Sequence, residues 1–337
     1  MIQVLADEID SKGSLYPFAA TRSIIDIRIG IFTIREKWQM IAPGQVNFGD
    51  DPSKSLSSRI IPTADFNAAG TEPKSGYKLL EKPWHIFQFN DWAIRADFKL
   101  ITKERSSAKI PPSVSTINEA DIFIEEGARL SYCMLNASTG PIYIGKNAEI
   151  MEGTIIRGPF AACEGSAIKM GSRIYGATTV GPYSVVGGEI KNVMFFGYSN
   201  KAHDGYLGDS VIGEWCNLGA GTSNSNLRNT ASDVKVWNQS TKQYETVGLK
   251  CGLLMGDYSR CAINTSFNTG TVVGIASNIF CEGLTPKYIP DFSWGAGEAG
   301  TYLFDKAISD INNWKKLKNK ELSEKEIQTL KSIFGHT

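Results

Sequence analysis

Aliphatic residues recur at every sixth position through the middle of the chain. Stepping by six from one isoleucine meets eight consecutive positions without a polar side chain: Ile144, Ile150, Ile156, Ala162, Ile168, Ile174, Val180 and Val186. A period of six matches neither the 3.6-residue helix nor a simple alternating strand, although it is a multiple of the strand repeat. One buried aliphatic residue followed by a small residue indicates a short strand and a corner. Three such units close one triangular coil.

The same period returns later in the chain. It joins Ile212 to Leu218, and a longer run contains Met255, Cys261, Phe267, Val273 and Ile279. Stacked coils pair their strands in parallel and bury a column of aliphatic side chains. The pattern therefore predicts a mainly β fold, a parallel β-helix of hexapeptide repeats, with a small α/β region before it and helices after it. A doubly wound α/β domain is disfavoured because residues 140–186 contain no helical segment of ten or more residues.

The pattern divides the chain into three regions, residues 1–110, 111–285 and 286–337. A helix that begins at Pro83 is expected to cover one open end of the β-helix. Residues 223–248 contain a predicted hairpin arm that projects toward a neighbouring subunit. Two helices are predicted at the C-terminus, the second beginning at a capping box formed by Ser323 and Glu326, and both are expected at the last coil.

Composition narrows the classes of partner. Thirty-five basic residues balance thirty-five acidic ones, so no overall field favours nucleic acid or an anionic membrane surface. Small ligands or other proteins are the expected partners. The six cysteines form no C-x-x-C pair and are predicted to be reduced core thiols. The start of the sequence lacks the features of a leader peptide, and no apolar run approaches ~18 residues, so a cytoplasmic location is expected.

Chemistry is expected where the repeat is interrupted, because regular coils are scaffold. The first interruption, residues 187–211, contains Glu189, Lys191, Lys201, His203 and Tyr206. His203 is the candidate general base, since an imidazole with a pKa near 6.5 takes up and releases protons at neutral pH. A solvated loop histidine is the alternative interpretation, and Lys201 is predicted to be a surface charge. No metal site is predicted, because a zinc enzyme of this fold needs three histidines on adjacent coils. Of His85, His203 and His336, one falls in the β-helix.

The spacing of these residues resembles a known family. In "EIK" the chain has Glu189 and Lys191, with His203 fourteen residues after the glutamate and Tyr206 three further on, followed by "LGD", "NLGAGT" from Asn217 and a second asparagine, Asn226. This arrangement is similar to the acetyltransferase half of the bifunctional N-acetylglucosamine-1-phosphate uridyltransferase/glucosamine-1-phosphate acetyltransferase. Where the family has "KAGH", this chain has "KAH", so the glycine before His203 is missing. The resemblance implies that the β-helix is left-handed and works as a homotrimer.

The resemblance also implies roles for individual residues. Lys191, Tyr206, Asn217 and Asn226 are assigned to a sugar phosphate, and Glu189 to orienting the substrate amine. Backbone N–H groups near Gly219 and Ala220 are expected to approach acetyl-CoA, the co-substrate. Both asparagines have an alternative interpretation as stacked residues of β-helix turns. Arg157 and Arg173 are further candidate phosphate ligands, between which the sequence does not choose.

Nearly all of the chain resembles a bacterial group described as putative sugar nucleotidyltransferases of this bifunctional type. Residues 1–110 then correspond to a reduced nucleotidyltransferase-like region and linker. The family's glycine-rich nucleotide loop is represented here by "YPFAATRS" with Arg22, which offers fewer unobstructed backbone N–H groups. Nucleotidyl transfer is therefore expected to be reduced or lost, with Mg²⁺ needed only if it survives.

The sequence supports one principal function and two alternatives. The principal hypothesis is an acetyl-CoA-dependent N-acetyltransferase of the hexapeptide-repeat class that acts on an amino-sugar phosphate in nucleotide-sugar and cell-envelope precursor synthesis. One alternative is a protein of the sugar-1-phosphate nucleotidyltransferase family with reduced or lost activity. The other is a non-catalytic β-helix that binds ligands or assembles with partners.

Overall fold

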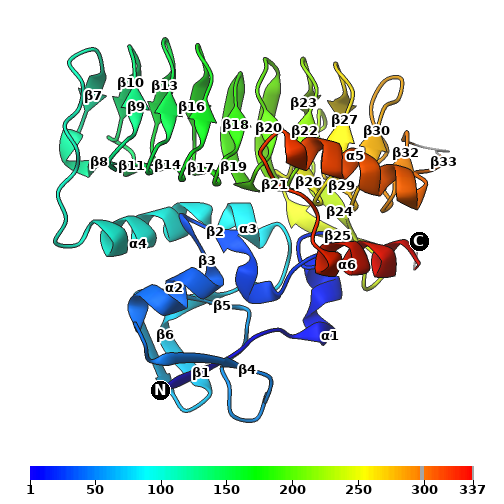
Figure 1. Ribbon diagram of the computed structural model, residues 1–337, viewed down its shortest axis with the longest axis horizontal. Coiled ribbons are helices and arrows are strands. Elements are labelled where there is room, and N and C mark those ends of the chain that lie inside the picture. The colour runs from blue at the N-terminus through cyan, green and yellow to red at the C-terminus, as the bar shows by residue number, and fades with distance from the viewer. Residues whose placement is uncertain (297–299, 336–337) are drawn as a thin grey trace.

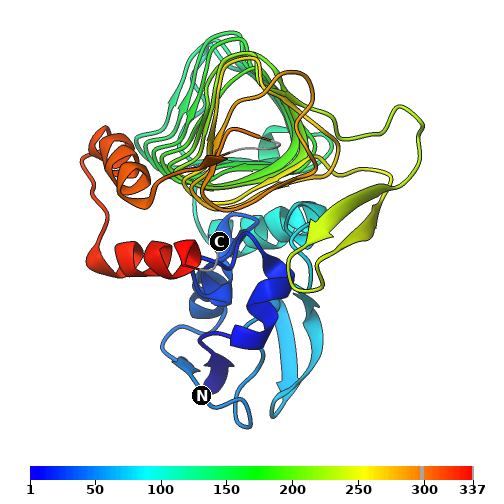
Figure 2. The same cartoon turned by 90° about the vertical axis from the view of Figure 1, so that its right-hand side faces the viewer.

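The centre of the protein is a parallel β-helix with a triangular cross-section (Figures 1 and 2). The structure, a computed structural model, describes residues 1–296 and 300–335. Parallel ladders connect successive coils, as where Ile142–Ile144 pairs with Phe160–Ala162 and that strand pairs with Thr178–Val180. The predicted fold, a mainly β chain built on hexapeptide repeats with a small α/β N-terminal region and C-terminal helices, is confirmed.

The strands lie on three faces of the prism. Face A contains β7 (Ser115–Ile117), β10 (Met134–Asn136), β13 (Ile155–Arg157), β16 (Arg173–Tyr175), the first half of β19 (Glu189–Gly197), the first half of β21 (Tyr206–Glu214), β23 (Ser223–Asn224) and β28 (Ser266–Phe267). Face B contains β8 (Ile122–Ile124), β11 (Ile142–Ile144), β14 (Phe160–Ala162), β17 (Thr178–Val180), the second halves of β19 and β21, β26 (Leu253–Met255), β29 (Thr271–Val273) and β31 (Tyr288–Ile289). Face C contains β9 (Arg129–Leu130), β12 (Glu149–Ile150), β15 (Ala167–Ile168), β18 (Val185–Val186), β20 (Asn200–Lys201), β22 (Asn217–Leu218), β27 (Arg260–Cys261), β30 (Asn278–Ile279) and β32 (Ser293–Trp294), which pairs with β33 (Gly300–Thr301).

The six-residue pattern marks the interior of the prism. All eight positions from Ile144 to Val186 are at most 1% exposed and belong to one core, together with Ile212, Leu218 and the later run from Met255 to Ile279. Several interior positions are polar, among them Lys201 and Asn224. Lys201 follows Val186 on face C, and Asn224 follows Leu207 on face A. Both are buried, so the prediction that Lys201 is a surface charge is wrong.

The N-terminal region packs against face B. Its elements are β1 (Ile2–Leu5), α1 (Ile9–Lys12), η1 (Gly13–Leu15), η2 (Ile24–Asp26), β2 (Arg28–Ile29), β3 (Phe32–Thr33), α2 (Ile34–Ile41), β4 (Val46–Gly49), β5 (Ile60–Ala69), β6 (Glu72–Leu79), α3 (His85–Gln88) and α4 (Asn90–Thr102), and η3 (Glu119–Asp121) follows within the first coil. Outward side chains of face B, among them Met194, Phe196 and Val211, share a core with Phe18 and Trp84. Helices α3 and α4 run along this side wall beneath the coils (Figure 1). The prediction that they close an open end is wrong, because their apolar side chains meet the outer surface of face B.

The hairpin arm also folds back onto its own chain. It consists of β24 (Val234–Asn238) and β25 (Gln243–Gly248), and Val234 and Val236 are buried in the core that the N-terminal region shares with face B. Lys82 forms an ion pair with Glu245 across this contact at 2.6 Å. The arm therefore clasps the N-terminal region (Figure 2), and the predicted projection toward a neighbouring subunit is wrong.

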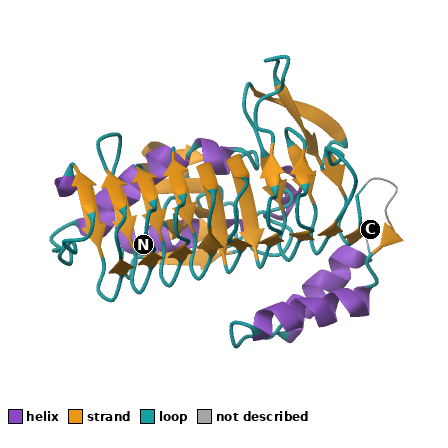
Figure 3. Cartoon of the chain, turned by 90° about the horizontal axis from the view of Figure 1, so that it is seen from above, coloured by secondary structure: helices purple, strands orange, loops and turns teal. Residues whose placement is uncertain are grey.

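The C-terminal helices α5 (Phe304–Lys316) and α6 (Glu324–Phe334) lie beside the prism (Figure 3), although they were expected at its last coil. They pack on an aromatic ladder of Tyr183, Tyr198, Trp215 and Tyr258, which occupy equivalent corners between faces B and C. Neighbouring rings in the ladder stack with centroids 5.2 and 4.4 Å apart. All four ladder residues have positive φ, between 55° and 63°, where rings of this size are rarely found. In the described part of the chain, no helix is both long and apolar enough to span a bilayer.

Candidate active site

Polar side chains from three successive coils meet on face A, because parallel pairing aligns residues one coil apart. The register places Arg173, Glu189 and Tyr206 in one row, and Tyr175 beside Lys191 in the next. The Tyr175 hydroxyl donates a hydrogen bond to Glu189 Oε1 at 2.7 Å, and Arg173 Nη2 lies 3.5 Å from Glu189 Oε2. We call the group formed by Arg173, Tyr175, Glu189, Lys191, Tyr206, Asp209 and Asn226 the face A cluster.

Asp209 holds the second half of this cluster together. Its carboxylate accepts hydrogen bonds from the side-chain amides of Asn226 and Asn192, and Lys191 Nζ lies 3.7 Å away. Asn226 Nδ2 also donates to the Tyr206 hydroxyl at 3.1 Å. Asp209 is 4% exposed and has φ of 46°, so its side chain is fixed by a corner of the backbone. The structure therefore joins three predicted residues, Lys191, Tyr206 and Asn226, through the carboxylate of Asp209, whereas Glu189 is held by Tyr175 and Arg173.

Burial and nearby carboxylates keep the phenols of the cluster protonated. Burial raises the pKa of Tyr206 above its ordinary value, and the charge of Asp209 adds to this effect. The hydrogen bond to Glu189 raises the pKa of Tyr175. The Tyr206 hydroxyl, which accepts from Asn226, can therefore donate its proton to a hydroxyl or phosphate oxygen of a ligand at neutral pH, whereas Tyr175 already donates its proton to Glu189.

An open cleft adjoins the cluster on face A. Its volume is about 520 Å³, and its lining includes Ile155, Arg157, Arg173 and Tyr175. Arg173 connects the cleft to the cluster through its contact with Glu189. Arg157 also faces the cleft, but it makes no ion pair with a carboxylate among the described residues.

His203 lies at the corner between faces C and A, directly before Tyr206 begins its strand. Its side chain is exposed and borders a cleft of about 400 Å³ whose lining includes Lys169, Gly187 and Ala220. In the described chain, the imidazole has no side-chain partner that would orient it. Backbones approach closely at this corner: a Cβ on Gly188 would lie 3.0 Å from the carbonyl oxygen of His203.

A buried lysine fixes the backbone that carries His203. Lys201 points into the prism, and its ammonium group donates hydrogen bonds to the carbonyl oxygens of His203 and Asp204, the latter at 3.2 Å. Burial lowers the pKa of Lys201 to about 8, and the charge of Asp204 opposes this decrease. The corner is therefore held from inside by a cation that was not recognised in the sequence.

The remaining predicted residues fall outside the cluster. Asn217 lies on face C, paired in register with Asn200 and Arg260. Gly219 donates its N–H to the Cys261 carbonyl at 3.2 Å, which ties it to the ladder, whereas no partner is found within the described chain for the Ala220 N–H. Ala220 lines the His203 cleft. The structure thus places Glu189, Lys191, Tyr206 and Asn226 on one face, and His203, Ala220 and Asn217 at the next corner and face.

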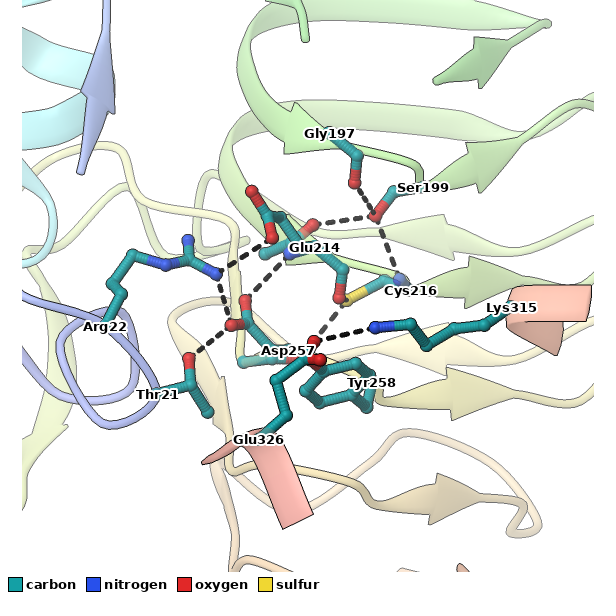
Figure 4. Close-up of polar contacts among 12 residues, drawn as sticks. Thr21, Arg22, Gly197, Ser199, Glu214, Cys216, Asp257, Tyr258, Lys315 and Glu326 are labelled. Carbon is teal, nitrogen blue, oxygen red and sulfur yellow. Dashed lines mark hydrogen bonds and ion pairs between the residues drawn. The ribbon is translucent and has the colours of Figure 1, made fainter. Parts of the chain in front are cut away.

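Arg22, in the loop that corresponds to a nucleotide-binding loop, points toward the outer surface of the β-helix (Figure 4). Arg22 Nη2 and the Thr21 hydroxyl both donate to Asp257, which is 2% exposed, and Glu214 Oε2 lies 3.5 Å from Arg22 Nη2. Burial disfavours the charged guanidinium, but Asp257 and Glu214 outweigh burial and raise the pKa of Arg22. Arg22 therefore joins the N-terminal region to face B and is not presented to solvent.

The same junction contacts the C-terminal helices. Lys315 Nζ lies 2.7 Å from Glu326 Oε1, and the hydroxyl of Tyr258, which follows Asp257, donates to the same carboxylate at 3.0 Å (Figure 4). No group of three or more metal-binding side chains is found within residues 1–296 and 300–335. His336 lies outside the described residues.

Comparison with known proteins gives matches to both halves of the chain. A family model described as sugar nucleotidyl transferase matches residues 3–52. The bifunctional sugar-1-phosphate nucleotidylyltransferase/acetyltransferase of Sulfurisphaera tokodaii is 26% identical over 260 residues, which cover 76% of this chain and 56% of that protein. The bifunctional protein GlmU of Methanococcus maripaludis is 29% identical over 80% of this chain and 58% of its own length. GlmU of Methanocaldococcus jannaschii is 41% identical over 86 residues, 26% of this chain and 21% of its own length.

Among solved structures, a UDP-N-acetylglucosamine acyltransferase of Francisella novicida aligns with 69% of this chain and 86% of its own, at 14% identity and a TM-score of 0.35. The fold assignment rests on the strand register of the chain itself. The chain spans less than three fifths of the length of the curated relatives described above. These relatives confirm the resemblance expected from the sequence: the chain is similar to bifunctional sugar-1-phosphate nucleotidylyltransferase/acetyltransferases over most of its length.

Proposed function

We propose that this chain is an acetyl-CoA-dependent N-acetyltransferase that acts on an amino-sugar phosphate in the synthesis of nucleotide-sugar and cell-envelope precursors. The observation that carries the proposal is the face A register, which aligns two cations, Arg173 and Lys191, with hydroxyl and amide donors from neighbouring coils. Guanidinium and ammonium groups bind phosphate, and phenols and amides bind sugar hydroxyls. The relative from Sulfurisphaera tokodaii is named as an acetyltransferase, which agrees with this chemistry.

His203 is the general base of the proposed reaction. It takes the proton from the substrate amine as the nitrogen attacks the thioester carbon; an N–C bond forms, the C–S bond breaks, and the imidazolium returns the proton to the leaving sulfur, so that the coenzyme leaves as a thiol. Glu189, fixed by Tyr175, accepts a hydrogen bond from the amine and orients it. The Ala220 N–H faces the reacting oxygen at the same corner. Gly187, Gly188 and Ala220 form the part of the cleft lining that has little or no side chain, which would let a thioester approach the backbone closely there.

A second copy of the chain completes the proposed site. The cluster residues lie on face A, whereas Asn217 lies on face C and His203 at the corner between them. Faces A and C of one prism point in different directions, so one small ligand does not contact both. When two prisms pack side by side, face A of one chain faces the His203 corner of the next. Face B is covered by the N-terminal region and is excluded from such packing. We therefore propose the homotrimer that the family resemblance implies.

Nucleotidyl transfer is not part of the proposal. Arg22 is committed to Asp257 and Glu214, so the residue that corresponds to the basic end of a nucleotide loop does not reach a bound phosphate. We expect no pyrophosphate release from UTP and a sugar 1-phosphate in the presence of Mg²⁺. Release of pyrophosphate at a catalytic rate would instead favour the nucleotidyltransferase alternative.

The decisive experiment measures thiol release from acetyl-CoA with glucosamine 1-phosphate and related amino-sugar phosphates. His203→Ala is expected to lower kcat by roughly 10²-fold or more. His85→Ala, an identical substitution in α3, is the matched control and is expected to leave the rate unchanged. Equal rates for the wild type and His203→Ala would remove His203 from the mechanism. Absence of turnover with every acceptor would favour the non-catalytic alternative.

A further inference from the structure

A second polar pocket lies where the chain leaves face A to form the hairpin arm. Its volume is about 330 Å³, and its lining includes Ser225, Arg228, Asn268, Thr269 and Lys287. Ser225 directly precedes Asn226 of the face A cluster. Adjacent strands lie about 4.8 Å apart, so the coil of β28 is roughly 10 Å beyond that of Tyr206 along the prism. The pocket is therefore near the cluster but separate from it.

Two cations face this pocket without a carboxylate partner. Within the described residues, neither Arg228 nor Lys287 forms an ion pair, and no aspartate or glutamate lines the pocket. Arg228 Nη1 donates to the Asp233 carbonyl at 3.3 Å, and Lys287 Nζ donates to the Lys235 carbonyl at 3.4 Å. Burial lowers the pKa of Lys287, and the nearby charge of Arg228 lowers it further. These like charges repel each other, and an anion between them would remove the repulsion.

Neutral donors complete the lining. The Thr269 hydroxyl donates to Ser225 Oγ at 3.1 Å, and Asn268 Oδ1 accepts the Thr269 N–H, so the Asn268 amide group is turned the other way. In the described chain, that Asn268 Nδ2 group and the side chain of Asn229, which also lines the pocket, have no hydrogen-bond partner. A guanidinium, an ammonium and free amide donors around one hollow form the donor set that binds phosphate oxygens.

We propose that this pocket, at the base of the arm, binds the diphosphate group of an organic ligand. Two cations contributed by separate segments fit two linked phosphates better than one. Binding at this pocket does not depend on acetyl transfer. Two classes of ligand contain such a diphosphate: the coenzyme A of the proposed donor, and a nucleoside diphosphate sugar. The arm then has two roles, since it clasps the N-terminal region through Glu245 and supplies Arg228 to the pocket.

Calorimetric titration of the full chain with inorganic pyrophosphate, coenzyme A and UDP-N-acetylglucosamine tests the proposal. Arg228→Met and Lys287→Met are each expected to weaken pyrophosphate binding by about tenfold or more, because each removes a charged hydrogen-bond donor. Lys287→Arg should retain binding. Lys242→Met removes an equal charge from the far end of the same arm and should leave binding unchanged.

Calorimetry measures binding without turnover, so this test is independent of whether the chain transfers an acetyl group. Weakened binding of coenzyme A in the two pocket variants would identify the donor as the ligand, and weakened binding of the nucleotide sugar would identify the other source. Failure of the wild type to bind pyrophosphate, or equal binding by Arg228→Met and Lys287→Met, would overturn the proposal even if acetyl transfer is intact.

Discussion

Replacing Lys201 with methionine removes a positive charge from inside the β-helix while keeping a side chain of similar length. Lys201 is fully buried, and the pKa of its ammonium group falls from an ordinary 10.5 to about 8, because burial disfavours the charge. The difference corresponds to roughly 3 kcal/mol, an order-of-magnitude cost of keeping the group charged in the folded state. Below pH 8 both the folded and the unfolded chain carry the proton, so the full cost is present.

Stability is therefore expected to rise with pH between about 8 and 10.5. In this range the folded protein releases the proton from Lys201 before the unfolded chain does, so the unfolded state binds more protons and the free energy of unfolding increases. From pH 7 to pH 9.5 the gain is roughly 2 kcal/mol. Lys201→Met lacks this group, so its free energy of unfolding should fall relative to that of the wild type by this amount over the same interval.

The assay is urea unfolding of both proteins at pH 7 and pH 9.5, analysed as a difference so that groups common to both cancel. Lys146→Met, which removes a lysine from an exposed corner of the same prism, is the matched control. Its difference from the wild type should be the same at both pH values. If the difference between the wild type and Lys201→Met also stays constant, Lys201 does not carry a buried charge and the account of the His203 corner is wrong.

Two further predictions concern stability. Ile156→Ala should lower the free energy of unfolding by about 2–5 kcal/mol, because the side chain is fully buried in the prism, whereas Ile155→Ala, at the neighbouring and 49% exposed position, should cost much less; equal losses in chemical denaturation would contradict the assigned strand orientation. Asp257→Ala should cost roughly 3 kcal/mol or more, because it leaves the Arg22 guanidinium buried beside Glu214 alone, and limited proteolysis should then release the N-terminal region. An unchanged digestion pattern for Asp257→Ala would show that this junction does not hold the two parts together.

The core of the fold was predictable because each face of a coil takes about six residues, so that one interior side chain recurs every six positions. Steps of six also connect Phe195, Lys201 and Leu207, and Ile212, Leu218 and Asn224, in phases that differ from the run ending at Val186, but two of these positions are polar. A hydrophobicity pattern cannot recognise a buried lysine whose partners are backbone carbonyls. The prediction of a surface charge at Lys201 failed for this reason.

The candidate site was predictable in part, and the coil length explains which part. Glu189 and Tyr206 are seventeen residues apart, one coil, and their strands pair in register. Asn217 is twenty-eight residues beyond Glu189, which is not a whole number of coils, so it lies on another face. Stepping one coil back from Glu189 and Lys191 reaches Arg173 and Tyr175, a signal that the sequence contained. The assigned chemical roles of all these residues stay predictions.

Contacts between distant segments left no local signal. The amphipathic pattern of α4 indicates which of its sides is buried but not which surface covers it, and the helix proved to lie on the wall of the prism. Arg22 meets Asp257 across a separation of 235 residues, and neither residue stands in a recognisable motif with the other. Such pairings depend on how whole regions dock.

The aromatic ladder beneath α5 and α6 holds its rings on backbones bent into a left-handed conformation. For residues other than glycine this geometry costs roughly 1–2 kcal/mol at each corner, whereas ring stacking returns about 0.5–1.5 kcal/mol per pair. The two stacked pairs therefore offset a part of the cost of the four corners, and packing against the covering helices adds to the stabilisation. Removing those helices would expose the four strained corners to solvent. Each corner would then be able to leave the left-handed conformation independently of its neighbours.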